Sequence, residues 1–345
     1  MRHTNTNKIT VKAPQLARIL AAILPTGKPV LIVGQPGVGK TSVCEQTAAA
    51  LDADLLVSHP VVADPTDYKG MPWVSGTGSD MVADFIPFGD LQRLIDAQRP
   101  TVCLLDDLGQ APPSVQAALM QLLLARQING HRISDHVMFV ACTNRKEDRA
   151  GVSGILEPVK GRFGAILHLE HDVDAWIEWA LGAGRMPVEL VAFIRFRPDL
   201  LSAFVPTADM TNTPTPRNVA AVGDLFPHVD PEDRLAVFSG ACGLAWATEF
   251  VAFCQIAHQL PDARLVLANP DRADVPLEPS VLYATCGMIA RVATQSNWPA
   301  VMKYARRMSS EFATLLVNMA TSRDAALFAT REYTEWAAEH AADVL

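Results

Sequence analysis

A glycine-rich segment near the N-terminus has the residue types that bind nucleotide phosphates. It fits the pattern G-x-x-x-x-G-K-[ST] at every fixed position, and with the next residue it comprises Gly34, Gln35, Pro36, Gly37, Val38, Gly39, Lys40, Thr41 and Ser42. Its glycines let backbone N–H groups turn toward phosphate oxygens, and a following helix would present its positive end to them. Lys40 would reach the β- and γ-phosphates, and the Thr41 hydroxyl would bind Mg²⁺. The segment predicts a nucleoside triphosphate site.

Two later apolar segments end in polar side chains that suit the same chemistry. The segment 101–105 is followed by Asp106, placed to hold Mg²⁺ directly or through water, and by Asp107, placed to orient an attacking water. The segment 137–143 is followed by Asn144, which could hydrogen-bond the γ-phosphate or the attacking water. The alternative is that each segment simply closes in a polar turn.

The elements that must position these residues follow from hydrophobic spacing. Short apolar runs predict strands at 30–33, 55–58, 102–105, 137–141 and 165–169. Helical spacing predicts helices at 43–51, 91–97 and 114–126. This alternation is typical of an α/β fold with a doubly wound parallel sheet, which binds its ligand at the carboxyl ends of the strands. From about residue 172 only helical spacing remains, as at 173–181 and 188–196.

Composition narrows the class of protein. The chain has 345 residues, enough for two domains, and its net charge of −8 argues against a general electrostatic grip on nucleic acid. Six scattered cysteines without a C-x-x-C pair indicate reduced, buried thiols and a cytoplasmic protein. The apolar segment 235–257 contains glycines, Gln255 and the single charge Glu249. We expect a buried helix there and no membrane span, because a charge at the bilayer centre costs several kcal/mol.

The motifs together resemble the AAA+ ATPases of the MoxR branch. The similarity is strongest over residues 106–119, D-D-L-G-Q-A-P-P-S-V-Q-A-A-L, and continues at 144–145, 158–163 and 215–217, so that it covers roughly residues 12–225. The resemblance implies a P-loop AAA+ core over 1–171, a helical lid over 172–225 and a C-terminal helical extension over 226–345. It also implies ATP and Mg²⁺ as ligands.

Roles for four side chains come with this resemblance. Asn144 takes the sensor-1 role, Arg162 the arginine-finger role in a neighbouring subunit, and Arg217 the sensor-2 role. Arg145 and Arg149 compete for the finger role, and Arg162 and Arg217 could instead be a surface arginine and a helix start. The family usually has Asp-Glu where this chain has Asp106-Asp107. Hydrolysis is then slow, or the loop that carries Asp107 lies closer to the nucleotide.

Three other segments have predicted places. The long, turn-rich stretch 59–88 resembles the helix-2 insertion of this clade, which faces the central pore. An Asn-Gly turn within 127–133 predicts a hairpin where the family has its pre-sensor-1 hairpin, although a plain surface hairpin is the alternative. His168 and His171 close a strand and lack a second cluster at ligand spacing, so a metal site there is not expected.

The function implied is a Mg²⁺-dependent ATPase that remodels a partner protein. The resemblance implies a homo-oligomer, a hexamer, because the finger acts in trans. By the same resemblance the partner would be a separate polypeptide, such as one with a von Willebrand factor A domain. A nucleic-acid-directed AAA+ motor or loader, and an ATP-gated scaffold that hydrolyses slowly, are the alternatives.

Overall fold

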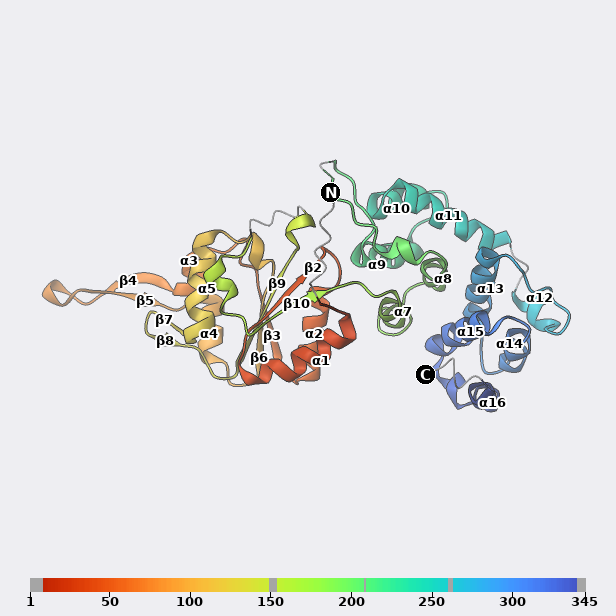
Figure 1. Cartoon of the computed structure of the whole chain (residues 1–345), viewed down its shortest axis with the longest axis horizontal. Helices are drawn as coiled ribbons and strands as arrows, with labels where there is room; N and C mark the ends of the chain where they lie inside the picture. Colours follow the sequence, from red (N-terminus) through yellow and green to blue (C-terminus); the bar gives the residue numbers. More distant parts are fainter. Residues whose placement is uncertain (1–8, 149–153, 208, 260–262, 340–345) are drawn as a thin grey trace. The chain divides into compact units, whose positions relative to one another are not determined.

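The computed structural model describes residues 9–148, 154–207, 209–259 and 263–339. The chain forms two compact units, Met1–Asp172 and Val173–Leu345. The first is an α/β unit, and the second is built from helices (Figure 1). Each has a hydrophobic core of its own.

One parallel sheet organises the α/β unit. Its strands lie in the order β1 (Thr10–Val11), β10 (Ala165–Leu169), β2 (Val30–Gly34), β9 (Val137–Thr143), β6 (Thr101–Leu105) and β3 (Asp54–Ser58). The five predicted strands are confirmed to within two residues at either end. β1 is an addition at the edge of the sheet, too short for hydrophobic spacing to reveal it.

Side-chain alternation along the strands explains why the sheet has helices on both faces. Successive residues of a strand point to opposite faces. One set packs with α1 (Ala13–Ile23) and α2 (Lys40–Ala50), and includes Val30, Ile32, Val102, Leu104, Val140 and Cys142. The other set packs with α4 (Gly89–Asp96), α5 (Pro113–Ala125) and α6 (Glu157–Lys160), and includes Leu31, Cys103, Leu105, Phe139 and Ala141. The sheet is therefore doubly wound, as predicted.

The order of the strands also indicates where a ligand would bind. After β2 the chain continues to β3 on one side of the sheet, whereas β10 pairs with β2 on the other side. The loops that leave the carboxyl ends of β2 and β10 therefore diverge, and ligands of open α/β sheets bind in the crevice at such a point. The glycine-rich segment is the loop that leaves β2.

Two hairpins belong to the same unit. The stretch between β3 and α4 forms α3 (Pro65–Lys69), β4 (Met71–Ser75), the 3₁₀ turn η2 (Gly78–Asp80) and β5 (Val82–Ile86). The predicted Asn-Gly hairpin is confirmed as β7 (Gln127–Ile128) and β8 (His131–Arg132). In Figure 1 the β4–β5 hairpin extends well beyond α3, α4 and α5.

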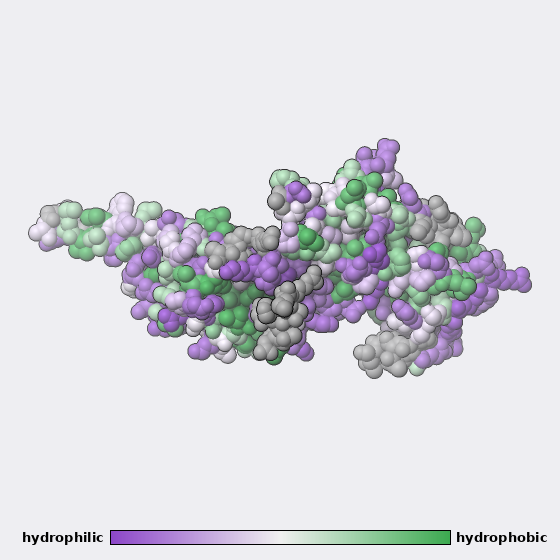
Figure 2. Space-filling model, turned by 45° about the horizontal axis from the view of Figure 1, so that its top comes forward, coloured by the Kyte–Doolittle hydropathy of each residue, from purple (hydrophilic) through white to green (hydrophobic). Residues whose placement is uncertain are grey.

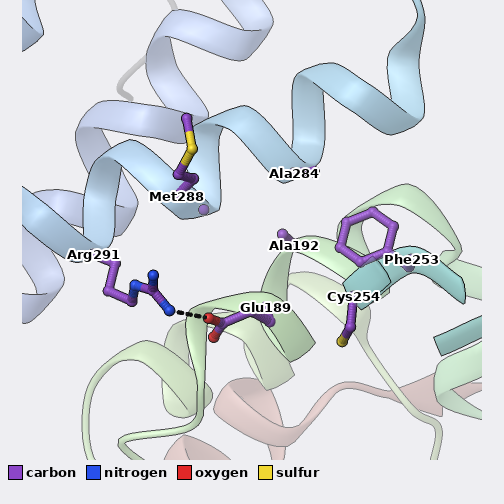
Figure 3. Close-up of a pocket in the computed structure, with 8 residues that line it drawn as sticks. Glu189, Ala192, Phe253, Cys254, Ala284, Met288 and Arg291 are labelled. Carbon is purple, nitrogen blue, oxygen red and sulfur yellow. Dashed lines mark hydrogen bonds and ion pairs between the residues drawn. The ribbon is translucent and has the colours of Figure 1, made fainter. Parts of the chain in front are cut away.

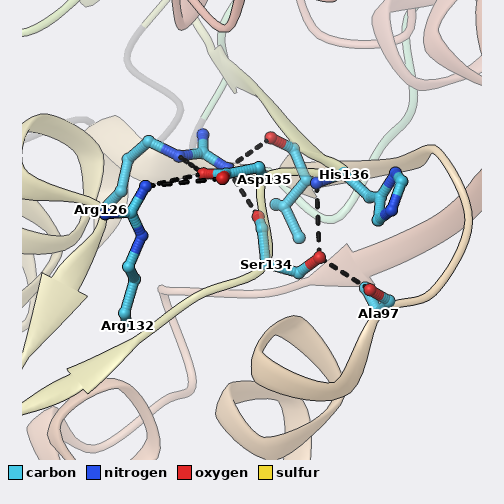
Figure 4. Close-up of polar contacts among 7 residues, drawn as sticks. Ala97, Arg126, Arg132, Ser134, Asp135 and His136 are labelled. Carbon is cyan, nitrogen blue, oxygen red and sulfur yellow. Dashed lines mark hydrogen bonds and ion pairs between the residues drawn. The ribbon is translucent and has the colours of Figure 1, made fainter.

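A polar cluster fixes the loop between β8 and β9 (Figure 4). Arg126 donates from Nη2 to the carbonyl oxygens of Ser134 at 2.6 Å and Val137 at 3.0 Å. The Ser134 hydroxyl donates to Ala97 O at 2.6 Å, and Arg132 pairs with Asp135 at 3.0 Å. Partial burial of the Arg126 guanidinium lowers its pKa. The cluster ties the end of α5 to the start of β9 and so fixes where β9 enters the sheet.

The second unit consists of helices and short 3₁₀ turns. The helices are α7 (Val173–Leu181), α8 (Val188–Phe196), α9 (Pro216–Leu225), α10 (Arg234–Cys242), α11 (Leu244–Gln259), α12 (Ala263–Ala268), α13 (Pro279–Val292), α14 (Trp298–Ala305), α15 (Ser310–Arg323) and α16 (Arg331–Glu339). α13 packs against both α8 and α15. One core, with Trp298, Phe193 and Trp336 among its fully buried members, extends from α7 to α16.

The long apolar segment 235–257 is not the single buried helix we expected. It forms parts of α10 and α11, which are separated at Gly243. Gly243 has φ +88°, a backbone conformation that glycine adopts readily and residues with a Cβ atom rarely adopt. Trp246 and Phe250 of α11 are buried in the unit's core. Within the described ranges, no helix combines the length and the apolar character needed to cross a membrane.

Candidate nucleotide-binding site

The glycine-rich segment connects β2 to α2 in the geometry of a phosphate-binding loop. Gly39 precedes the first residue of α2 and has φ +97°, which favours glycine at this position. Gly39 has no side chain to cap α2, so the helix begins without a side-chain cap. The first N–H groups of a helix have no partner within it and carry its positive partial charge. The start of α2 is therefore suited to bind phosphate oxygens.

Lys40 connects this loop to the carboxyl end of β9. Its Nζ donates to the carbonyl oxygens of Gly34 at 3.1 Å and Gln35 at 3.0 Å, and to Asn144 Oδ1 at 2.7 Å. The side chain is buried, with 7% exposed. Three contacts on an ammonium group hold it in one position, so the charge that would meet the phosphates is placed in advance.

Thr41 and Asp106 form an oxygen pair at the start of α2. Thr41 Oγ1 donates to Asp106 Oδ2 at 3.2 Å. Magnesium prefers oxygen ligands at about 2.0–2.1 Å in octahedral geometry, in which adjacent ligands lie roughly 3 Å apart. The separation of these two oxygens and their chemistry both fit two neighbouring Mg²⁺ ligands.

Asp107 lies on the other side of Asn144 from Lys40. Asn144 Nδ2 donates to Asp107 Oδ1 at 3.2 Å, while its Oδ1 accepts from Lys40. The amide, which is 8% exposed, therefore joins the lysine of the loop to the second carboxylate. The backbone of Asp107 is left-handed, with φ 54° and ψ 33°. Although Asp is one methylene shorter than Glu, its carboxylate reaches the Asn144 amide.

The competing arginines differ in their surroundings. Arg145 donates to Asp148 from Nε at 2.9 Å and from Nη2 at 2.6 Å, and to Gln35 Oε1 at 3.4 Å. Asp148 is 4% exposed, and its hydrogen bonds raise the pKa of Arg145. Arg145 is thus bound to the loop of its own chain. Arg149 lies outside the described residues.

Arg162 follows α6 and is partly buried. Among the described residues, its buried Nε has no hydrogen-bond partner. A guanidinium nitrogen that is buried without a protein partner costs free energy unless water or another group satisfies it, and Arg195 Nε is in the same state.

A glutamine that sequence reasoning did not single out holds the backbone that leads into α6, the helix before Arg162. Gln116 of α5 is 1% exposed. Its Nε2 donates to the carbonyl oxygens of Ala111 and Gly154, each at 3.0 Å, and its Oε1 accepts from Leu156 N at 2.9 Å. Gln116 therefore holds the backbone that enters α6. It lies within the quoted 106–119 segment, but only the fold shows what it contacts.

Two hollows differ in their suitability for a nucleotide. One, of about 160 Å³, lies beside the phosphate-binding loop and is lined by residues that include Thr10, Gln35, Val38, Arg145, His168 and His171. The other lies between α8, α11 and α13, where Glu189 pairs with Arg291 at 3.1 Å (Figure 3). Its volume is about 30 Å³, which suits one or two water molecules and not a nucleotide. His168 and His171 thus lie at the edge of the candidate site.

Arg217 belongs to the second unit. It is exposed in the first turn of α9, after Thr215, whose hydroxyl caps the helix by accepting from Asn218 N at 3.2 Å. Its sensor-2 role stays a prediction.

The fold and this arrangement agree with a family match. Residues 30–170 match the protein family described as "ATPase family associated with various cellular activities (AAA)". The first unit therefore contains an AAA ATPase domain, with Lys40, Asp106 and Asn144 inside the matched range.

Comparison with individual proteins gives only distant similarity. The RuvB Holliday junction branch migration motor of Thermotoga maritima is 17% identical over 75% of each chain, with a TM-score of 0.39. A point mutant of Thermotoga maritima RuvB is 16% identical over 74% of each chain, with a TM-score of 0.41. No curated protein sequence matches the chain.

Proposed function

We propose that this protein is a Mg²⁺-dependent ATPase of the AAA+ class, of the MoxR type, that works as a ring and remodels a separate partner protein. The observation that carries the proposal is the convergence of Lys40, Asp107 and Asn144 within hydrogen-bond reach at the carboxyl ends of three strands. These residues lie far apart in the sequence, and together they supply a positive charge for the phosphates, a carboxylate to orient water and an amide to hydrogen-bond the γ-phosphate.

The residues of the phosphate-binding loop bind the triphosphate. The backbone from Gly34 to Ser42 surrounds the phosphates, and Lys40 neutralises charge on the β- and γ-phosphates. Thr41 and Asp106 would hold Mg²⁺, which when bound supplies positive charge against the phosphate oxygens. The hollow that includes Thr10 and Val38 is next to the loop and is the place for the nucleoside.

Asp107 and Asn144 act on the attacking water. Asp107 orients the water and accepts its proton, because its carboxylate lies 3.2 Å from the Asn144 amide that we assign to the γ-phosphate. Asn144 donates from Nδ2, so it holds Asp107 in place and supplies a hydrogen bond at the γ-phosphate. Arg217 takes the sensor-2 role from the helical unit.

Arg162 acts as the arginine finger of a neighbouring subunit. Arg145 is already bound to Asp148 and Gln35 of its own chain, whereas Arg162 has a buried nitrogen without a partner among the described residues. An arginine that stabilises transition-state charge is worth about 10³–10⁵ in rate where it acts in trans on GTPases. A finger that acts between subunits requires an oligomer, and we propose a hexamer.

The client is a separate polypeptide, such as one with a von Willebrand factor A domain. The acidic balance of the chain, −8, suits a protein client better than a nucleic-acid track. We place the protein in the cytoplasm, where its six cysteines stay reduced.

A mixing experiment tests the ring and the finger together. Arg162→Ala and Asp107→Asn are purified separately, and each is expected to bind ATP with nearly unchanged affinity and to hydrolyse it at least about 100-fold more slowly than the unaltered protein. When they are mixed, an Asp107→Asn subunit can supply an intact Arg162 to the intact site of an Arg162→Ala neighbour. The mixture should therefore regain turnover that neither variant has alone.

Arg145→Ala provides the matched control for the mixing experiment. Because Arg145 serves its own loop, mixing Arg145→Ala with Asp107→Asn should restore no more activity than each contributes separately. Failure of Arg162→Ala to complement Asp107→Asn, in protein that has assembled, would reject the finger in trans. ATP binding without measurable turnover in the unaltered protein would instead support the slowly hydrolysing scaffold.

A further inference from the structure

The β4–β5 hairpin, residues 71–86, carries an unusual number of exposed apolar side chains. Six large ones lie on it, at exposed fractions from 48% to 60%: Met71, Trp73, Val74, Met81, Val82 and Ile86. Of the six tryptophans in the chain, Trp73 is the one that is mainly exposed, at 58%. Contiguous exposed apolar surface of this kind marks an interaction site or an aggregation hazard in soluble proteins.

The register of the two strands gathers most of these side chains on one face. Met71 pairs with Ile86 and Trp73 pairs with Asp84, so these four side chains lie on the same face, as does that of Val82. An isolated two-stranded hairpin is at best marginally stable in water, because it has one exposed apolar face and nothing to bury it against. A partner that covers this face would supply the missing burial.

The base of the hairpin is held by the neighbouring β7–β8 hairpin. Asn129 Nδ2 donates to Lys69 O at 2.8 Å, just before β4 begins. His131 Nε2 donates to Phe85 O at 2.6 Å, near the end of β5. Beyond these contacts the hairpin extends from the α/β unit (Figure 1), and hydrophobic surface is visible along it in Figure 2. It is an arm with a fixed base and an exposed apolar face.

The charges on the arm specify the chemistry of the partner. Residues 70–88 contain Asp80 and Asp84 and no lysine or arginine. Asp84 is exposed and lies directly across from Trp73. A lysine or arginine side chain can lie over a tryptophan ring and pair with a carboxylate beside it. A phosphate backbone, in contrast, needs basic side chains that this segment lacks.

We infer that the β4–β5 hairpin binds an extended, apolar polypeptide segment that carries lysine or arginine, supplied by the partner protein. The inference rests on the proposed function in that the partner is a protein. It commits the contact to the face of Met71, Trp73 and Asp84. A second copy of this chain fits less well, because the chain is itself acidic, with a net charge of −8.

Direct binding to the full chain tests this without any need for ATP hydrolysis. The probe is a fluorescein-labelled synthetic peptide of leucine, valine and lysine, compared with a peptide in which glutamate replaces each lysine. Fluorescence anisotropy should show tighter binding of the lysine peptide to the unaltered protein. Trp73→Ser should weaken that binding roughly tenfold, because aromatic anchors dominate such contacts.

A charge exchange gives the sharper result. Asp84→Lys should weaken binding of the lysine peptide roughly tenfold and strengthen binding of the glutamate peptide, because the sign of the charge beside Trp73 is reversed. Leu265→Ser and Asp230→Lys are matched controls, since both residues are exposed but belong to the second unit, and neither should change binding. ATP binding by each variant checks that the α/β unit is folded.

The outcomes separate this inference from the proposed function. If the peptide binds as expected but ATP turnover is absent, the hairpin inference stands and the ATPase proposal fails. If turnover is present but the lysine peptide does not bind, or binds Asp84→Lys and the unaltered protein equally, the inference is overturned. Self-association that Trp73→Ser abolishes would assign the face to a second copy, and binding of single-stranded DNA that Trp73→Ser abolishes would assign it to nucleic acid; either overturns the inference.

Discussion

Asn144 is the residue on which the geometry of the candidate site depends most. It lies between a cation and a carboxylate, with Lys40 Nζ at 2.7 Å from its oxygen and Asp107 Oδ1 at 3.2 Å from its nitrogen. Both contacts fix which way the amide faces, since the oxygen must accept from the ammonium and the nitrogen must donate to the carboxylate. A γ-phosphate that enters the site would meet an amide whose orientation is already set.

Asn144→Ala should separate hydrolysis from binding. Lys40 keeps its two carbonyl partners in this variant, so affinity for ATP should change by only a few-fold, whereas turnover should fall by about 10²–10³, as when one preorganised donor is removed from other active sites. Nucleotide titration and steady-state phosphate release measure the two effects. Asn318→Ala, at an exposed asparagine of α15, is the comparison. Equal loss of binding and turnover would place Asn144 in the binding of ATP alone.

At the scale of elements, α5 and α6 are joined through the side chain of Gln116. Three hydrogen bonds from one buried amide satisfy backbone groups of Ala111, Gly154 and Leu156. The last two lead into α6, and Arg162 follows α6 by two residues. The position of the proposed finger is thus set from a helix that itself makes no contact with nucleotide in the proposed mechanism.

Gln116→Met should disturb the connection between α5 and α6, although the two side chains have similar volumes. Methionine has a similar volume but leaves three backbone groups without their partner, so the free energy of unfolding should fall by about 1–3 kcal/mol. Turnover should fall as well, with ATP affinity nearly unchanged, because Arg162 loses its support while the phosphate-binding loop does not. Urea unfolding and steady-state kinetics give the two values.

The control for this change lies on the same helix. Gln121 is exposed on α5, so Gln121→Met should leave both stability and turnover close to those of the unaltered protein. A Gln116→Met variant that is as stable and as active as Gln121→Met would show that the α5–α6 connection does not depend on these hydrogen bonds.

Elements were predictable from the sequence where local pattern determines them. The strands β2, β6 and β9 are continuous apolar runs because both faces of a parallel sheet are covered, and such runs are visible in the sequence. The Asn-Gly turn likewise predicts its hairpin, since few other residues adopt the required backbone. β1 was missed because two residues show no period.

Contacts between distant segments were beyond the reach of the sequence. Lys40 and Asn144 are 104 positions apart, and only the parallel order of β2 and β9 brings their ends together. The resemblance to a family named Asn144 as a sensor but gave no partner for it. In the same way, the sequence did not show that Arg145 pairs with Asp148 whereas Arg162 does not have such a partner among the described residues. That difference depends on which side chains the fold buries. The break at Gly243 was missed because the hydrophobic spacing continues on both sides of it.

At the scale of the whole molecule, two separate units bury all six cysteines as free thiols. Burial raises the pKa of Cys242, Cys254 and Cys286 to about 12, above an ordinary value of 9.0. The side-chain contact of Cys142 with Cys44, and its burial, raise the pKa of Cys142. Both units are therefore closed to thiol chemistry in the folded state.

This predicts a thiol reactivity and a pH dependence. A disulfide reagent should react with all six cysteines only after unfolding, because reaction needs an exposed thiolate.

The pKa of these thiols is higher in the folded state, so the unfolded state ionises first as the pH rises. The stabilisation is therefore complete below pH 9 and is lost between pH 9 and about 12. Urea unfolding at neutral pH and at a pH inside that range measures the loss. Rapid reaction of any thiol in the native protein would contradict the buried cores.

The left-handed backbone at Asp107 restricts which amino acids this position can accept. The backbone of Asp107 has φ 54°, and residues other than glycine, asparagine and aspartate adopt such an angle less readily. A saturation library at this codon would therefore be filtered twice, first by conformation and then by chemistry. Asparagine and glycine should fold and fail in hydrolysis, and most other residues should lose stability before catalysis is in question. Glutamate, the residue expected by resemblance, keeps the carboxylate but belongs to the second group. The aspartate is in this view the acid that the local chain geometry permits.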